Sequence, residues 1–367
     1  MRPIPSLRRA RGFSLAELMI ASGIGLAILA ALSTMFVKNT RAQQAVEQAH
    51  RQVENGRYAI DRIAEDLRHA GYFSEYYQLP SPGQAGFPAT TAAAQPCATA
   101  VTDLPAGMPL AIQAYDGGGS VPAEVAACLS AADYKTGTDV LVVRRASTST
   151  IAKSDPAVVG TQPYIQVNSP MFAPPNYVMD LGSNTGSFTL RFPTTNSSGV
   201  ADAMLRRYMV RIYFVSKCNV PASGLTCNGV SDDGGTPIPT LKMLELGPGP
   251  AFQKLALAEG IEELQFDFGI DDQPAAVNPA TGFVGDGVAD RLSMCDGASP
   301  CSTTDWHNVV SVQINLVARN TERSPGYTDD KTYSLGLKGY TAAPGDPYRR
   351  HAYSTFVRLN NTSMRRE

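Results

Sequence analysis

The chain has 367 residues, with 31 basic and 33 acidic side chains and a formal net charge of −2 at neutral pH. This balance gives no general basic surface of the kind that nucleic-acid-binding proteins present, so we expect no direct contact with nucleic acid. Charged residues make up only 17%, whereas there are 32 glycines and 26 prolines, which favours an extracytoplasmic, loop-rich β domain.

Residues 1–12 form a short basic leader that ends in glycine. Four arginines and no acid precede Gly12, and the positive-inside bias would hold this leader in the cytoplasm. Gly12 has no side chain, so the backbone at the end of this leader can lie extended in a narrow space. Without these 12 residues the chain has 355 (367 minus 12), of which 27 are basic and 33 acidic, a net charge of −6.

Residues 13–37 predict a membrane-spanning helix. They carry no charge except Glu17, and they exceed the roughly 20 residues that a helix needs to cross a bilayer. A carboxylate in the membrane core is costly, so Glu17 is expected to have a function. The alternative is a plain secretory signal or signal anchor, but the apolar stretch is too long for an ordinary signal-peptide core.

Residues 38–70 continue the helix in amphipathic form. They contain no proline, and apolar or small residues recur at steps of three and four from Val46 to Leu67. We expect the second half of this stripe to pack on the rest of the protein, with Gly71 ending the helix. A coiled-coil seam is the alternative, but the alanines and the glycine in the stripe are small for that purpose.

The rest of the chain predicts a loop-rich segment over residues 71–136 and a β-rich head over residues 137–367. Alternating or continuous apolar runs predict the strands, which we place at 139–146, 187–192, 207–215, 241–246, within 255–269, at 307–319 and at 353–359. The predicted fold class is therefore α+β. A long N-terminal helix, transmembrane in its first half and amphipathic in its second, packs on a mainly antiparallel head of one β unit or two.

The six cysteines fall into three near-neighbour couples: Cys97 with Cys128, Cys218 with Cys227, and Cys295 with Cys301. Six cysteines allow 15 pairings, and the sequence alone does not choose among them, although proximity favours these three couples. An oxidising periplasm would convert them to disulfides. A zinc site is the rival interpretation, but no couple has C-x-x-C spacing and no histidine lies at ligand spacing.

No enzyme motif is present: there is no H-E-x-x-H, no G-x-S-x-G and no P-loop, so we expect neither catalysis nor a cofactor. One weak candidate for a metal site is a Ca²⁺ loop around Asp286 and Asp290. Ca²⁺ takes six to eight oxygen ligands, and these two carboxylates supply too few. An Asp-Gly turn is the favoured interpretation of this segment.

The stretch from Arg11 to Leu18 resembles the type III signal of type IV pilins and pseudopilins. Later blocks resemble the PilW family of minor pilins, at residues 55–60, 63–73, 257–266, 306–316 and 348–355. The resemblance implies that a prepilin peptidase cuts between Gly12 and Phe13 and that the new N-terminal Phe13 is methylated. It further implies that Glu17 pairs with the N-terminal ammonium of a neighbouring subunit during assembly.

The same resemblance implies a minor pilin that primes assembly of the type IV pilus and lies at or near its tip, supporting twitching motility and adhesion. Its implied partners are the inner membrane, the prepilin peptidase, the major pilin, other minor pilins of PilV, PilX, FimU and PilE type, and a PilY-type tip adhesin. The protein would move from the inner membrane to the pilus, with its head periplasmic or extracellular. Two alternatives are a J-type-like pseudopilin of type II secretion and a membrane-anchored extracytoplasmic adhesin or binding protein.

Overall fold

The computed structural model of the chain describes Gly12 and residues 14–74, 95–169, 175–193, 199–272 and 285–364. The chain divides into two compact units, Met1–His50 and Arg51–Glu367. The helix α1, Leu15–His69, begins in the first unit and ends in the second.

In the first unit α1 is long and apolar enough to cross a membrane, and its most apolar window is not buried by other parts of the protein. The helix start is capped locally. The Ser14 hydroxyl accepts from the Ala16 amide at 3.2 Å, while the Glu17 carboxylate accepts from the Ser14 amide at 3.0 Å. At the other end, Arg68 and His69 occupy the last turn, and Gly71 follows with a φ of +71°, the left-handed conformation that commonly ends helices.

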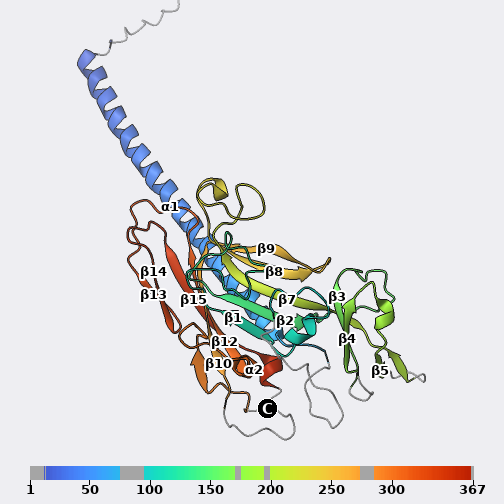
Figure 1. Cartoon of the computed structure of the whole chain (residues 1–367). Helices are drawn as coiled ribbons and strands as arrows, with labels where there is room; N and C mark the ends of the chain where they lie inside the picture. Colours follow the sequence, from blue (N-terminus) through green and yellow to red (C-terminus); the bar gives the residue numbers. More distant parts are fainter. Residues whose placement is uncertain are drawn as a thin grey trace, which may run out of the picture. The chain divides into compact units, whose positions relative to one another are not determined.

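The second unit contains two larger antiparallel sheets and two small hairpins (Figure 1). The first sheet has seven strands: β1 (Ile112–Tyr115), β2 (Val140–Ala146), β3 (Pro163–Val167), β4 (Tyr177–Leu181), β7 (Leu205–Ser216), β8 (Thr240–Gly247) and β9 (Ala251–Glu259). The second sheet has four strands in the order β11 (Arg291–Ser293), β10 (Ile261–Ile270), β12 (Val309–Arg319) and β15 (Arg350–Arg358). The hairpins are β5 (Arg191–Pro193) with β6 (Val200–Asp202), and β13 (Thr332–Leu335) with β14 (Lys338–Thr341).

Short helices complete the second unit: η1 (Leu104–Gly107), η2 (Thr185–Ser187), η3 (Asp232–Gly234), α2 (Thr303–Asn308) and α3 (Asn360–Ser363). The chain passes from the first sheet to the second at Gly260, between β9 and β10. Gly260 has a φ of +77°, and a Cβ there would lie 2.6 Å from the Arg319 carbonyl oxygen, so the connection requires glycine. The structure thus confirms the predicted α+β class.

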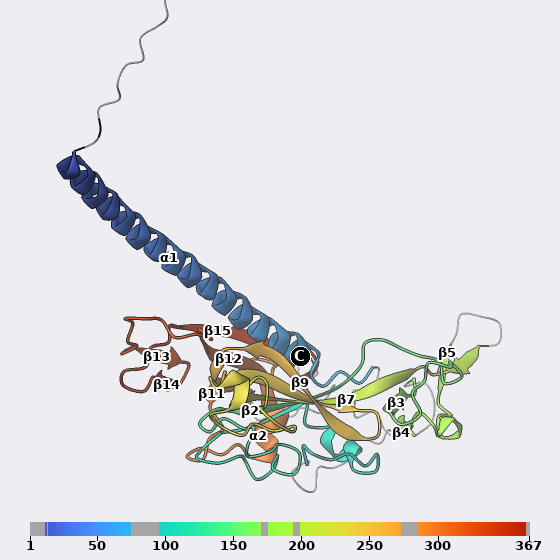
Figure 2. The same ribbon diagram turned by 90° about the horizontal axis from the view of Figure 1, so that it is seen from above.

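The C-terminal part of α1 packs on both sheets, and it lies along β12, β15 and β9 in both views (Figures 1 and 2). Its fully buried side chains include Ile63 and Leu67, which join one core cluster with residues of β2, β7, β10 and β12. Burying a side chain of this size contributes about 1.5–3 kcal/mol. Val53, which belongs to the N-terminal part of the predicted stripe, is 37% exposed. Only the C-terminal part of the stripe therefore reaches the core.

A second core lies on the other face of the first sheet. β7 serves both cores, because Tyr213 and Val215 face the α1 side whereas Val210, Ile212 and Phe214 pack with Phe73 and Met108. This double burial explains why β7 is apolar or buried along almost its whole length.

Several predicted elements need correction. The strand expected at 187–192 is mostly absent, because the Gln166 side chain accepts from the Leu190 amide at 2.9 Å in place of a strand partner. The strand expected from His307 begins at Val309, since Ser302 and Asp305 form a capping box that starts α2. The segment 71–136 is rich in turns and contains the short strand β1, which pairs with β2 in the first sheet.

Gly56 of α1 lies directly against the Tyr353 ring of β15. A Cβ on Gly56 would overlap the ring of Tyr353, with Cζ only 2.7 Å away. Gly56→Ala is expected to lower the free energy of unfolding by about 1–3 kcal/mol through overpacking, which outweighs the roughly 0.5–1 kcal/mol that alanine brings to a helix interior. Urea unfolding of the full chain in detergent measures the change. Tyr353→Leu in the same chain should make Gly56→Ala less harmful, and a Gly56→Ala protein as stable as the parent would contradict the packing argument.

Candidate functional site

The predicted processing site lies at the start of the chain. Gly12 is exposed, whereas residues 1–11 and Phe13, the predicted methylation site, lie outside the described residues. Glu17 is exposed in the first turn of α1, where its Oε2 accepts from the Ser14 amide at 3.0 Å. Its predicted partner belongs to another subunit, so the assembly role of Glu17 stays a prediction.

All six cysteines are paired as disulfides, in the three couples that sequence proximity favoured. Cys218, Cys227 and Asp232 bring three metal-ligand atoms within 4.8 Å of one another. Both sulfurs are consumed by the disulfide, so neither provides a thiolate ligand. Asp232 instead accepts backbone N–H groups of Ala222, Asn228 and Gly229 at 2.6–2.8 Å, which orders the loop between β7 and β8.

The weak calcium candidates both accept backbone hydrogen bonds. Asp286 Oδ1 accepts from the Val288 amide at 3.0 Å, a contact two residues along the chain that fits the Asp-Gly turn interpretation. Asp290 Oδ2 accepts from the Asp272 amide at 3.0 Å and so joins two segments that are 18 residues apart. Residues 273–284, between the two acidic stretches, lie outside the described part.

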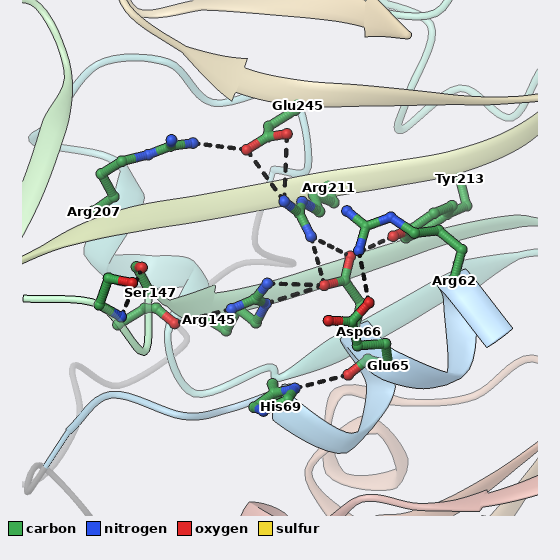
Figure 3. Close-up of polar contacts among 12 residues, drawn as sticks. Arg62, Glu65, Asp66, His69, Arg145, Ser147, Arg207, Arg211, Tyr213 and Glu245 are labelled. Carbon is green, nitrogen blue, oxygen red and sulfur yellow. Dashed lines mark hydrogen bonds and ion pairs between the residues drawn. The ribbon is translucent and has the colours of Figure 1, made fainter. Parts of the chain in front are cut away.

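A buried polar cluster surrounds Asp66, which the sequence did not single out (Figure 3). Asp66 is on α1 and its side chain is fully buried. Arg211 of β7 donates from Nη1 to both carboxylate oxygens at 2.6 and 2.7 Å. Arg145 of β2 donates to Oδ1 from Nε at 3.2 Å and from Nη2 at 3.0 Å, and the Tyr213 hydroxyl donates to Oδ2. One carboxylate therefore fastens α1 to two strands.

The period of β7 explains why its polar side chains gather here. Successive side chains of a strand alternate between faces, so Arg207, Met209, Arg211 and Tyr213 lie on the face that meets α1. Glu245 of β8 is directly opposite Arg211 across the sheet and accepts from its Nη2 at 3.4 Å. The same Glu245 accepts from Arg207 Nη2 at 2.8 Å.

The electrostatic environment keeps the Asp66 carboxylate charged. Burial alone would raise the pKa of Asp66, but the hydrogen bonds and charge of Arg211, together with Tyr213 and Arg145, outweigh it and lower the pKa. Burial and the neighbouring Asp66 raise the pKa of Tyr213, so its hydroxyl stays protonated and donates. The cluster is thus an ion pair with every oxygen of Asp66 satisfied.

A second buried cluster surrounds Arg350 of β15, whose side chain is fully buried. It donates to Glu262 from Nε and Nη2, to Asp329 Oδ2 from Nη1 at 3.0 Å, and lies 2.9 Å from Asp346 Oδ2. Glu262 is on β10, while Asp329 and Asp346 lie on either side of the β13–β14 hairpin. Arg350 therefore ties this hairpin segment to the second sheet.

Comparison with known proteins gives one informative result. Searches of curated proteins and of solved structures found no significant match. Residues 227–361 match the family model PilW, described as Type IV Pilus-assembly protein W. This region runs from the loop before β8 through β15 and includes the whole Arg350 cluster. The match supports the PilW family and a role related to assembly of the type IV pilus for this chain.

Proposed function

We propose that this protein is a minor pilin, a structural rather than catalytic subunit that primes assembly of the type IV pilus and lies at or near its tip. The observation that carries the proposal is the PilW match over residues 227–361 in a chain whose N-terminal helix is apolar enough to span a membrane. In this proposal, residues 1–12 are removed by the prepilin peptidase and Phe13 is methylated. The helix then leaves the inner membrane for the filament, with the head periplasmic and afterwards extracellular.

The two ends of α1 have different tasks in this proposal. Glu17 pairs with the N-terminal ammonium of an adjacent subunit, which removes an uncompensated charge from an apolar environment. Asp66 fixes the C-terminal end of the helix in the head. A force applied to the N-terminal end of α1 would therefore be transmitted to the head. The partners are the major pilin, other minor pilins of PilV, PilX, FimU and PilE type, and a PilY-type adhesin. Twitching motility and adhesion follow from the filament.

A pseudopilin of type II secretion would share the N-terminal signal, and a membrane-anchored adhesin would share the helix. The PilW description favours pilus assembly over both. Deletion of the gene separates the three: loss of surface pili with normal secretion of a type II substrate supports the minor pilin. Normal piliation with failed secretion would instead support a pseudopilin of type II secretion. Normal piliation with normal secretion would support a membrane-anchored adhesin or binding protein.

Glu17→Ala provides the residue-level test. We expect the variant to be processed normally but recovered in sheared pili at a level several-fold lower than the parent, because the charge pair that guides docking is lost. Glu54→Ala, an exposed acid farther along α1, is the matched control and should be recovered like the parent. Equal recovery of Glu17→Ala and Glu54→Ala would sink the charge-pairing role.

A further inference from the structure

A polar pocket of about 470 Å³ opens beside the Asp66 cluster. The described residues that line it come from β2, β7, β8 and β9 and from the loops around them. They include Arg145, Arg207 and Arg211, which Figure 3 shows approaching Asp66 and Glu245 from neighbouring strands. The pocket lies within the second unit and is separate from the predicted processing site.

The pocket has more donors than acceptors. Its three guanidinium groups pair with two carboxylates, Glu245 in the lining and Asp66, which does not itself line the pocket, and this leaves one positive charge in excess. Every oxygen of the two carboxylates already accepts: those of Asp66 from Arg211, Arg145 and the Tyr213 hydroxyl, and those of Glu245 from Arg211 and Arg207.

Two buried donors remain without an acceptor. Gln162 lines the pocket and is only 2% exposed, yet its Nε2 has no hydrogen-bond partner in the described structure. The Nε of Arg211 is likewise buried and has no partner there. An unsatisfied buried donor destabilises a protein, so an incoming acceptor that reached either of these two groups would stabilise the bound state.

We propose that this pocket binds a carboxylate side chain of an acidic peptide segment in a partner protein. One excess positive charge matches a monoanion, and a planar carboxylate fits the fork of a guanidinium. Val159, Met209 and Pro248 also line the pocket and offer apolar contact to the methylenes of Glu. No aromatic ring is among the described lining residues, and this disfavours an acidic sugar, which would stack on one. The Arg207 side chain is 45% exposed, so it is accessible to the carboxylate of an incoming peptide.

The test uses the full chain in detergent at low salt and two blocked pentapeptides that differ only in a central Glu or Gln. We expect the Glu peptide to bind about 10-fold more tightly, as one charge-assisted contact provides. Arg207→Gln and Gln162→Leu should each weaken the Glu peptide several-fold. Glu245→Gln should strengthen it, because it removes the competing carboxylate and frees Arg207.

The matched control is Arg191→Gln, an exposed arginine that also forms an ion pair but lies outside the pocket, with Asp202. It should bind the Glu peptide like the parent, and thermal unfolding of each variant confirms that the head is intact. Equal binding of the Glu and Gln peptides, or equal loss in Arg191→Gln and Arg207→Gln, would overturn the proposal. Glucuronate that competes better than the Glu peptide would assign the pocket to an acidic sugar and also overturn it.

Discussion

Asp66→Asn is expected to lower the free energy of unfolding of the head by about 3–5 kcal/mol, the usual cost of breaking a buried ion pair by removing one partner. The asparagine keeps the size of the side chain, but Arg145 loses the carboxylate to which it donates and Arg211 keeps Glu245. It also leaves the Tyr213 hydroxyl with a poorer acceptor. Because Asp66 fastens α1 to β2 and β7, the loss should loosen the helix from the sheet.

Urea unfolding of the full chain in detergent measures this, with fluorescence of Trp306 as the signal. Trp306 is the only tryptophan and is buried in the head at 5.0 Å from the Phe268 ring centroid, so it reports on the core directly. The control is Asp61→Asn, an exposed acid on the same helix, which should change stability by no more than about 0.5 kcal/mol. If the two variants unfold at the same urea concentration, the Asp66 cluster does not anchor the helix.

The same cluster predicts a pH dependence. The pKa of Asp66 is lower in the folded protein than its ordinary value of 3.8, so its contribution is fully present above that value. It is lost as the pH falls through the folded pKa, when the carboxylate takes up a proton. The parent should therefore lose more stability than Asp66→Asn between pH 5 and the acid range, and parallel pH profiles for the two proteins would contradict this.

Arg350→Gln is expected to lower the free energy of unfolding of the head by a similar amount, about 3–5 kcal/mol. In this case the acids lose their basic partner, whereas in Asp66→Asn the bases lose their acidic partner. Glu262 would keep Arg319, whose Nη1 is 3.9 Å away. Asp329 would keep the Tyr333 hydroxyl and Asp346 the Tyr348 amide, but both would lose the guanidinium that pairs with them. Arg350→Lys should rescue little, because an ammonium cannot make the paired contacts that the guanidinium makes with Glu262.

Hydrogen exchange of the full chain localises the damage of Arg350→Gln. The amides of the β13–β14 hairpin should exchange faster than in the parent, while those of β2 and β7, held by the Asp66 cluster, should change less. Arg358→Gln, an exposed arginine on the same strand, is the control and should leave both regions as they were. Uniform acceleration across both sheets would mean that Arg350 supports the whole head and not this hairpin segment.

The fold was predictable where the sequence is periodic and long. The proline-free stripe to Leu67 predicted α1, and the β-branched runs predicted β2, β7 and β12. The short strands β1, β3 and β4 were missed, because four or five residues among glycines and prolines give little pattern. The error at 187–192 has a tertiary cause, since Gln166 satisfies the Leu190 backbone that a strand partner would otherwise satisfy.

The candidate sites were likewise predictable only where a local motif carries them. Gly12, Phe13 and Glu17 could be predicted because the N-terminal motif is local, and their roles stay predictions because their expected partners are other molecules. Asp66 was missed because its partner Arg211 is 145 residues away, and a helix with many surface acids gives no reason to select one. Two signals were present: Asp66 falls on the buried stripe beside Ile63 and Leu67, and Arg211 interrupts the apolar run from Tyr208 to Val215.

The family match also separates two parts of the head. Residues 227–361 contain the second sheet and the Arg350 cluster, whereas Arg145, Arg207 and Arg211 of the proposed peptide pocket precede the matched region. Only Glu245, Gly247, Pro248 and Gln253 of the described lining fall within it. A partner-specific pocket would be expected in a part of the head that the shared family pattern does not cover.

The most direct test of the pilin assignment is the intact mass and N-terminal sequence of the protein from membranes with and without the prepilin peptidase. The assignment predicts a chain that lacks residues 1–12 and starts at a methylated Phe13, and only when the peptidase is present. An uncut chain in both membranes, or a cut near Ala30 that does not depend on the peptidase, would contradict it and leave an ordinary membrane anchor or secreted protein.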